Sequence, residues 1–159
     1  MRRLLIRPGA IGDCILSLPA LEYLAAAYTE VWISSPIVPL IGFADVVCPL
    51  SSTGLDTLGV GDLEPPPRLI EKLKAFDSIV SWYGSNRPEF RETILKRGIP
   101  CEFHAALPTA DFTGHATDFF AWQVGAPQGL VARIPIQPSS QRDRVVIHPI
   151  LPGPSTKFL

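Results

Sequence analysis

The sequence has no excess of basic residues and few charged residues of either sign. Fourteen Lys and Arg residues stand against 15 Asp and Glu residues, which gives a formal net charge of −1 at pH 7. Nucleic-acid-binding domains usually carry a basic excess, and polybasic membrane anchors need clustered cations. The charge therefore argues against both functions. The 47% of hydrophobic residues argues equally against an intrinsically disordered chain.

Cysteine is scarce, and long apolar runs are absent from the sequence. Cys14, Cys48 and Cys101 are far apart and show no Cys/His spacing of the kind that binds zinc, so we predict no zinc site. We expect neither a metal ion nor a cofactor in this chain. No run approaches the roughly 20 apolar residues of a transmembrane helix. Residues 1–27 imitate a signal peptide, but Pro8 and several charged residues interrupt the apolar region that a signal peptide requires. We therefore expect a cytoplasmic protein.

Proline and glycine, by contrast, are plentiful, and these 17 and 12 residues divide the chain into short segments. Apolar runs typical of strands alternate with segments of helical periodicity. Strands are predicted at 3–7, 31–33, 46–48, 78–83, 101–104 and 144–148. Helices are predicted through 15–28, at 37–43, after Pro67, between a capping box at Asn86/Glu89 and Gly98, and at 116–124. This alternation predicts a doubly wound, mostly parallel, Rossmann-like α/β sheet.

The last sixteen residues differ from the rest in how they fit this pattern. A strand at 144–148 runs into a proline-rich loop and then into residues typical of a first helical turn, where the sequence stops. We therefore expect residues 1–143 to form one Rossmann-like domain and residues 144–159 to begin another.

The turn from Arg7 to Asp13 is the first candidate for chemistry, because ligands of open α/β sheets bind at the carboxyl ends of strands. Gly9 and Gly12 allow a ligand to approach the backbone and leave N–H groups free at a helix N-terminus. Asp13 is either a carboxylate that complements the helix dipole or a catalytic base at the mouth of a cleft. The turn is neither GxGxxG nor a P-loop, which disfavours a dinucleotide site and an NTPase.

The second candidate is the segment 81–87, at the end of the fourth predicted strand. Trp82 offers an aromatic face for sugar C–H groups, and Ser85 and Asn86 offer hydrogen bonds to sugar hydroxyls. The same residues are equally consistent with a buried aromatic core and a helix cap. No GxSxG nucleophile elbow occurs in the chain.

The segment Leu4–Leu21 resembles the opening of glycosyltransferase family 9, the lipopolysaccharide heptosyltransferases. That family typically opens with an apolar strand, an Arg, a Gly-Ala-x-Gly-Asp turn and a helix with a Pro-Ala-Leu step, which here is Pro19 to Leu21. The segment Ile147–Pro149, followed by a glycine-containing loop and Lys157, resembles the family's second signature. The chain departs from that signature at 150–152, where Ile-Leu-Pro replaces the usual Gly-Ser-Gly.

The resemblance implies the N-terminal half of a GT-B architecture, with the acceptor on residues 1–143 and the ADP-sugar on a C-terminal domain. The implied reaction is metal-independent, inverting transfer of heptose or a related sugar from an ADP-sugar to a lipopolysaccharide core, at the inner face of the inner membrane. Asp13 falls on the family's general base, and Lys157 falls on the lysine that neutralises the donor diphosphate. We expect the following residues to line the acceptor site: Gly9, Ala10, Gly12, Trp82, Ser85 and Asn86.

Two other functions remain open from the sequence. The chain alone is predicted to lack transferase activity, because one domain offers no opposing wall to hold the donor in line with the acceptor. It is then a non-catalytic α/β module that binds a sugar or a protein partner. Alternatively, the last strand and the tail form a dimer or partner interface.

Overall fold

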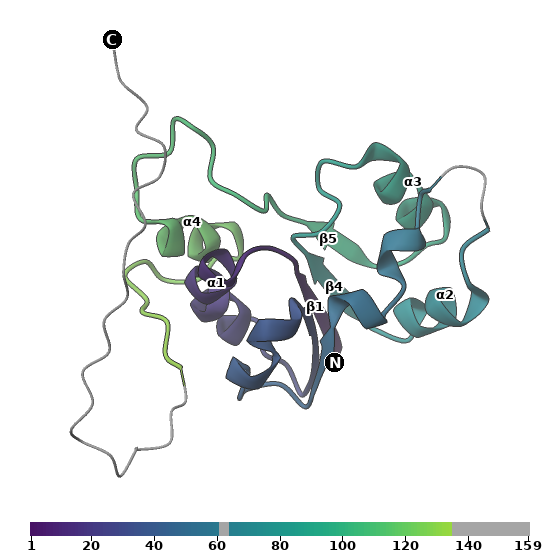
Figure 1. The fold of residues 1–159 in the computed structure, drawn as a ribbon, viewed down its shortest axis with the longest axis horizontal. Coiled ribbons are helices and arrows are strands. Elements are labelled where there is room, and N and C mark those ends of the chain that lie inside the picture. The colour runs from purple at the N-terminus through teal and green to yellow at the C-terminus, as the bar shows by residue number, and fades with distance from the viewer. Residues whose placement is uncertain (61–63, 135–159) are drawn as a thin grey trace.

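A sheet of five parallel strands forms the centre of the computed structural model, which describes residues 1–60 and 64–134 (Figure 1). The order β3-β2-β1-β4-β5 is the order of the first five strands of a doubly wound sheet, and all four neighbouring pairs are parallel. This confirms the predicted fold class. The strands are β1 (Arg2–Arg7), β2 (Tyr28–Ile33), β3 (Val46–Pro49), β4 (Ser78–Ser81) and β5 (Cys101–Phe103).

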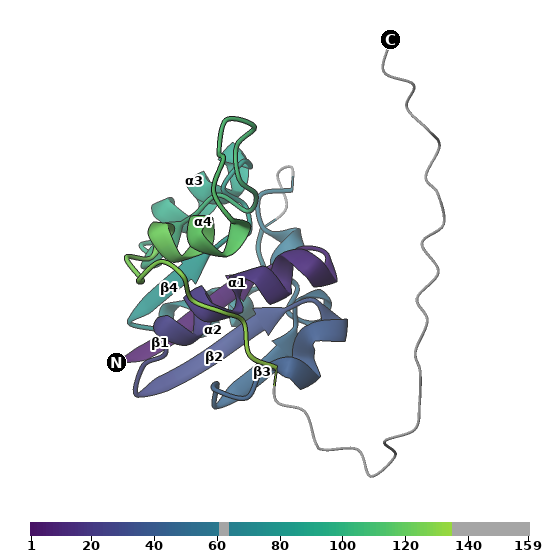
Figure 2. The same cartoon turned by 90° about the vertical axis from the view of Figure 1, so that its left-hand side faces the viewer.

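Helices cover both faces of this sheet. Figure 1 shows α1 and α4 on one face and α2 and α3 on the other, and Figure 2 is turned so that α1 and α4 lie in front. The α-helices are α1 (Ile11–Tyr23), α2 (Pro67–Lys74), α3 (Pro88–Lys96) and α4 (Ala116–Gln123). Three short 3-10 helices lie in the connections: η1 (Ser35–Leu40), η2 (Leu50–Ser52) and η3 (Leu55–Thr57).

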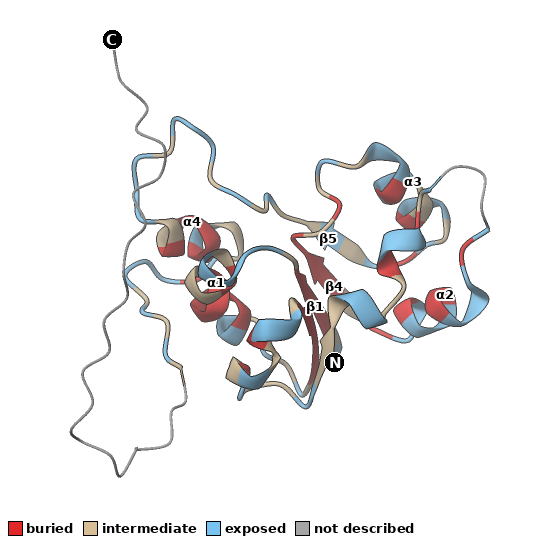
Figure 3. Cartoon of the chain, in the orientation of Figure 1, coloured by how far each residue is buried: buried red, intermediate tan, exposed pale blue. Residues whose placement is uncertain are grey.

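The central strand β1 separates two apolar cores. Leu4 and Ile6 belong to the core under α2 and α3, whereas Leu5 belongs to the core under α1 and α4. All three side chains are buried, and Figure 3 shows β1 and β4 coloured largely as buried. A strand buried on both faces reads as a continuous apolar run, which is why residues 3–7 were predicted as a strand.

Several predicted boundaries were wrong, and three of the differences concern helices. The helix predicted through 15–28 is α1, which ends at Tyr23, so Tyr28 belongs to β2 instead. The helix predicted at 37–43 is the 3-10 helix η1, whose two prolines cannot donate the backbone hydrogen bonds of an α-helix. The capping box is absent, because Arg87 is the N-cap without a side-chain bond and Pro88 sets the backbone angle of the first turn instead.

The predicted strand at 144–148 and the predicted domain boundary after residue 143 lie outside the described residues, as does Lys157. Within 1–60 and 64–134, no helix has the length and apolar character needed to cross a membrane.

Candidate functional site

The loops that follow β1 and β4 lie side by side at the carboxyl edge of the sheet. Ile6 of β1 is paired with Ser81 of β4, and the Trp82 amide donates to the Ile6 carbonyl at 2.9 Å. The strand order reverses between these two strands, and such a switch point is where open α/β sheets bind ligands. The two segments that the sequence indicated as candidate sites, 7–13 and 81–87, therefore begin next to each other at this edge of the sheet.

The turn after β1 exposes backbone at the start of α1. Gly9 has φ +129°, a backbone conformation that residues with a Cβ rarely adopt. Gly9, Ala10 and Gly12 are all exposed. The Cys14 amide donates to the Ala10 carbonyl at 3.0 Å and so begins the helical hydrogen bonds. The amides before Cys14 have no partner within the helix, as is general for the first turn, and they can donate to a ligand.

Asp13 lies in the first turn of α1 and is half-buried. A Cβ added to Gly9 would lie 3.8 Å from the Asp13 Oδ2 atom, so the carboxylate lies over the Gly9 backbone. The side chain is therefore neither sealed in the core nor free in solvent. This position suits both a dipole-stabilising carboxylate and a base that receives a proton from a ligand at the turn.

Arg7 lies beneath this turn, where it is only 1% exposed, and stabilises the turn by hydrogen bonds. Its Nε donates to the Ser17 hydroxyl at 2.9 Å, and its two terminal nitrogens donate to the carbonyls of Pro8 at 2.9 Å and Asp13 at 3.0 Å. The guanidinium also lies 4.6 Å from the centre of the Phe120 ring of α4. Arg7 thereby fixes the backbone of the turn against the helix that follows it.

Burial also changes the electrostatics of this turn. It lowers the pKa of Arg7, and the neighbouring Cys14 and Asp13 act in the opposite direction. An arginine nevertheless stays protonated in proteins, so a fixed positive charge lies beneath the turn. Burial raises the pKa of the Cys14 thiol, and burial together with the Glu102 charge raises the pKa of Cys101 to about 12. Neither thiol is a thiolate at neutral pH, which makes both poor nucleophiles.

A hollow of about 340 Å³, which we call the switch-point hollow, lies at the carboxyl edge of β2, β3 and β4. The Ser34 hydroxyl, one of its lining groups, donates to the Gly9 carbonyl at 2.7 Å and so ties the hollow to the glycine turn. Arg87 donates to the Tyr83 hydroxyl and brings a second cation to this edge. The lining residues are Ser34, Ser35, Leu50, Ser51, Asp56 and Tyr83.

The predicted acceptor residues of the second segment lie in different surroundings. Trp82 is 1% exposed and packs in the core under α1 and α4, with its ring centre 5.3 Å from that of His104. This burial does not support contact between the indole face and a ligand. Ser85 and Asn86 line a separate hollow of about 420 Å³ along α3. Tyr83, which comes from the same loop, is the residue that lines the switch-point hollow.

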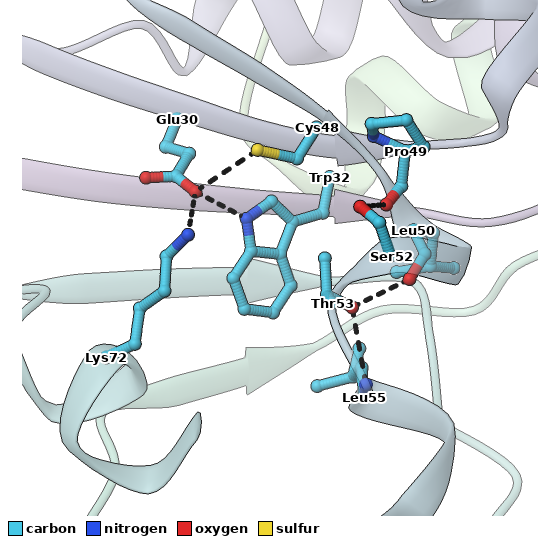
Figure 4. Close-up of polar contacts among 9 residues, drawn as sticks. All are labelled: Glu30, Trp32, Cys48, Pro49, Leu50, Ser52, Thr53, Leu55 and Lys72. Atoms are coloured by element: carbon cyan, nitrogen blue, oxygen red, sulfur yellow. Dashed lines mark hydrogen bonds and ion pairs between the residues drawn. The ribbon is translucent and has the colours of Figure 1, made fainter. Parts of the chain in front are cut away.

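A second buried charge lies on the α2 side of the sheet, and sequence reasoning missed it. The Glu30 carboxylate accepts from the Trp32 indole at 2.6 Å and forms an ion pair with Lys72 of α2 at 2.7 Å (Figure 4). The Cys48 thiol lies 3.8 Å from the same oxygen. Because Glu30 is 4% exposed and one of its carboxylate oxygens contacts all three of these groups, we interpret the cluster as a link between sheet and helix.

Lys72→Met is expected to lower the free energy of unfolding by about 1–3 kcal/mol, because it leaves a buried carboxylate without its cation. This loss of stability is smaller than the loss on breaking a fully buried ion pair, because the Lys72 side chain is 46% exposed. Urea denaturation measures the change, and Lys74→Met, at an exposed lysine of the same helix, is the matched control. An equal effect of the two substitutions would contradict the link.

In the described ranges, no three His, Cys, Asp or Glu residues are grouped as metal ligands would be. Comparisons with protein-family models, with curated proteins and with solved structures found no match to this chain.

Proposed function

We propose that this chain supplies the acceptor side of a glycosyltransferase that moves heptose or a related sugar from an ADP-sugar to a lipopolysaccharide core. The observation that carries the proposal is the position of Asp13, half-buried over an exposed glycine turn at the point where the strand order reverses. The Gly-Ala-Ile-Gly-Asp sequence of this turn and its resemblance to family 9 support the same function.

In the proposed reaction, the Asp13 carboxylate takes the proton of an acceptor hydroxyl as the acceptor oxygen attacks the anomeric carbon of the donor. A new C–O bond forms on one face of the sugar while the bond to the diphosphate breaks on the other, which inverts the configuration and releases ADP. The switch-point hollow beside the turn offers hydroxyl groups to an acceptor, and Arg87 brings positive charge for an anionic core sugar. Ser85 and Asn86 line a hollow along α3 and extend the same loop.

In this proposal, the groups that bind the donor lie outside the acceptor site described above. Lys157 is proposed to neutralise the donor diphosphate, and such a preorganised charge stabilises a leaving group without a metal ion. We place the reaction at the inner face of the inner membrane, where a lipopolysaccharide precursor is within reach.

The second candidate function is a non-catalytic α/β module that binds a sugar. The exposed backbone at Gly9, Ala10 and Gly12 favours it, because those groups can bind an anionic sugar whether or not Asp13 takes a proton.

The purified 159-residue chain is expected to bind an anionic core oligosaccharide weakly, to show no affinity for ADP, and to transfer no sugar from ADP-heptose. The reason is that in-line transfer needs both reactants fixed across a closed cleft. Calorimetric titration with each compound, followed by a transfer assay, tests this. Tight ADP binding or turnover by the chain alone would contradict the division into acceptor and donor sides.

A further inference from the structure

A third hollow, of about 510 Å³, lies between α4 and the chain that leads into it from β5. Figure 1 shows this chain passing from the end of β5 across to α4. No residue that lines it also lines the switch-point hollow. Its volume lies within the range of about 300–1,000 Å³ that small-molecule sites occupy. We call it the α4 hollow.

One wall of the α4 hollow is an indole in contact with solvent. Trp122 is 70% exposed, whereas Trp32 and Trp82 are at most 1% exposed. The face of an indole carries negative charge density, which attracts the weakly positive C–H groups of a sugar ring. Phe112 and Phe119 contribute an apolar lining, and their rings meet edge to face with centres 5.2 Å apart.

The other walls carry hydrogen-bonding groups, namely Thr109, Asp111, Thr113, Asp118 and Gln128. The Gly129 amide donates to Asp118 Oδ1 at 2.8 Å, which fixes that carboxylate. A carboxylate has about four acceptor sites, so most of the capacity of Asp118 remains for ligand hydroxyls. The hydroxyl of Thr109 lowers the pKa of Asp111 by a hydrogen bond, so Asp111 is charged at neutral pH.

The charge of the α4 hollow selects among ligands. The described residues that line it include two carboxylates and no Lys, Arg or His. A sugar phosphate or an acidic sugar is disfavoured there, because its negative charge is repelled by the two carboxylates. A quaternary ammonium ion suits an aromatic face, yet it has no hydroxyl to use the five polar side chains. A neutral sugar uses both the indole and the polar groups.

We propose that the α4 hollow binds an uncharged sugar ring, which stacks on Trp122 and donates hydroxyl hydrogen bonds to Asp111 and Asp118. The site is independent of the proposed transfer reaction, and it differs from the acceptor site in preferring neutral ligands. The exposed indole is thereby a binding surface.

The test uses the 159-residue chain and ligand-observed saturation-transfer NMR with the methyl glycosides of glucose, galactose and mannose. At least one glycoside is expected to give a saturable signal, and glucose 1-phosphate is expected to bind at least about tenfold more weakly. Quenching of tryptophan fluorescence by acrylamide provides a second readout. A bound sugar should protect Trp122, because the other two indoles are already buried.

Trp122→Ala and Asp111→Ala should each abolish the glycoside signal, and both variants should keep the melting temperature because both side chains are exposed. Tyr23→Ala, at another exposed aromatic residue that lies on α1, is the matched control and should bind normally. The proposal is overturned if no neutral glycoside binds, if Trp122→Ala binds as well as the parent chain, or if only tetramethylammonium shows Trp122-dependent binding.

Discussion

Replacing Asp13 with alanine is expected to lower kcat by about 10²–10⁴-fold in a transferase form in which a donor-binding domain accompanies residues 1–143. That range is the usual contribution of a positioned general base. The acceptor hydroxyl then has no carboxylate to take its proton as it attacks the donor. The KM for the acceptor should change little, because the exposed backbone of the glycine turn is unaltered. Steady-state kinetics with a core oligosaccharide acceptor measure both constants.

Two comparisons make this prediction specific to the base. If Asp13 only complements the dipole of α1, Asp13→Ala costs about 0.3–1 kcal/mol of stability and leaves kcat unchanged. Asp56→Ala removes a different carboxylate, which is exposed and lines the switch-point hollow, and should alter KM without the large loss in kcat. Equal losses of kcat in the two variants would contradict the assignment of Asp13 as the base.

Gly84→Ala is expected to lower the free energy of unfolding by about 2–5 kcal/mol, which combines left-handed strain with overpacking. Gly84 has φ +78°, and an added Cβ would lie 2.2 Å from the Phe90 ring. That ring is 1% exposed and packed edge to face against Tyr83 and Phe103, so it cannot move aside. Because Gly84 follows Tyr83, the same substitution should displace the loop at the switch point and weaken acceptor binding.

Gly54→Ala separates the two causes of that loss. Gly54 has a similar φ of +71°, but an added Cβ there meets nothing within 4 Å. It should therefore cost only the backbone strain of about 1–2 kcal/mol. Urea denaturation of both variants gives the difference. If Gly84→Ala were no worse than Gly54→Ala, close packing of the β4 loop on α3 would not be what holds this edge of the site.

The alternation of apolar runs and helical segments was sufficient to predict the parallel sheet, because each described strand is followed by a change of periodicity or a turn residue. The short run at 3–7 illustrates this, since burial on both faces leaves its centre, residues 4–6, without polar positions. Boundaries were harder to predict where proline decided them. At Pro36, the missing N–H donor outweighed the apolar periodicity that predicted an α-helix. At Pro88, the fixed backbone angle starts the helix without a side-chain cap.

The candidate site was only partly predictable, because much of it depends on contacts between distant segments. The glycine turn was visible as a local pattern. The burial of Arg7 was not, although a cation that closes an apolar strand just before Pro8-Gly9 was a usable signal. Trp82 enters the core and Tyr83 lines the switch-point hollow because side chains alternate beyond β4. A strand predicted to run to residue 83 implied opposite sides for these two residues, but it did not indicate which side carries the hollow.

The most direct test of the proposed acceptor site is an NMR titration of the amide-labelled 159-residue chain with lipopolysaccharide inner-core oligosaccharide. We expect saturable shifts of the Gly9, Ala10, Gly12 and Asp13 amides together with those of Ser34 and Tyr83. Saturable shifts confined to other parts of the chain, or no shifts at all, would contradict this expectation.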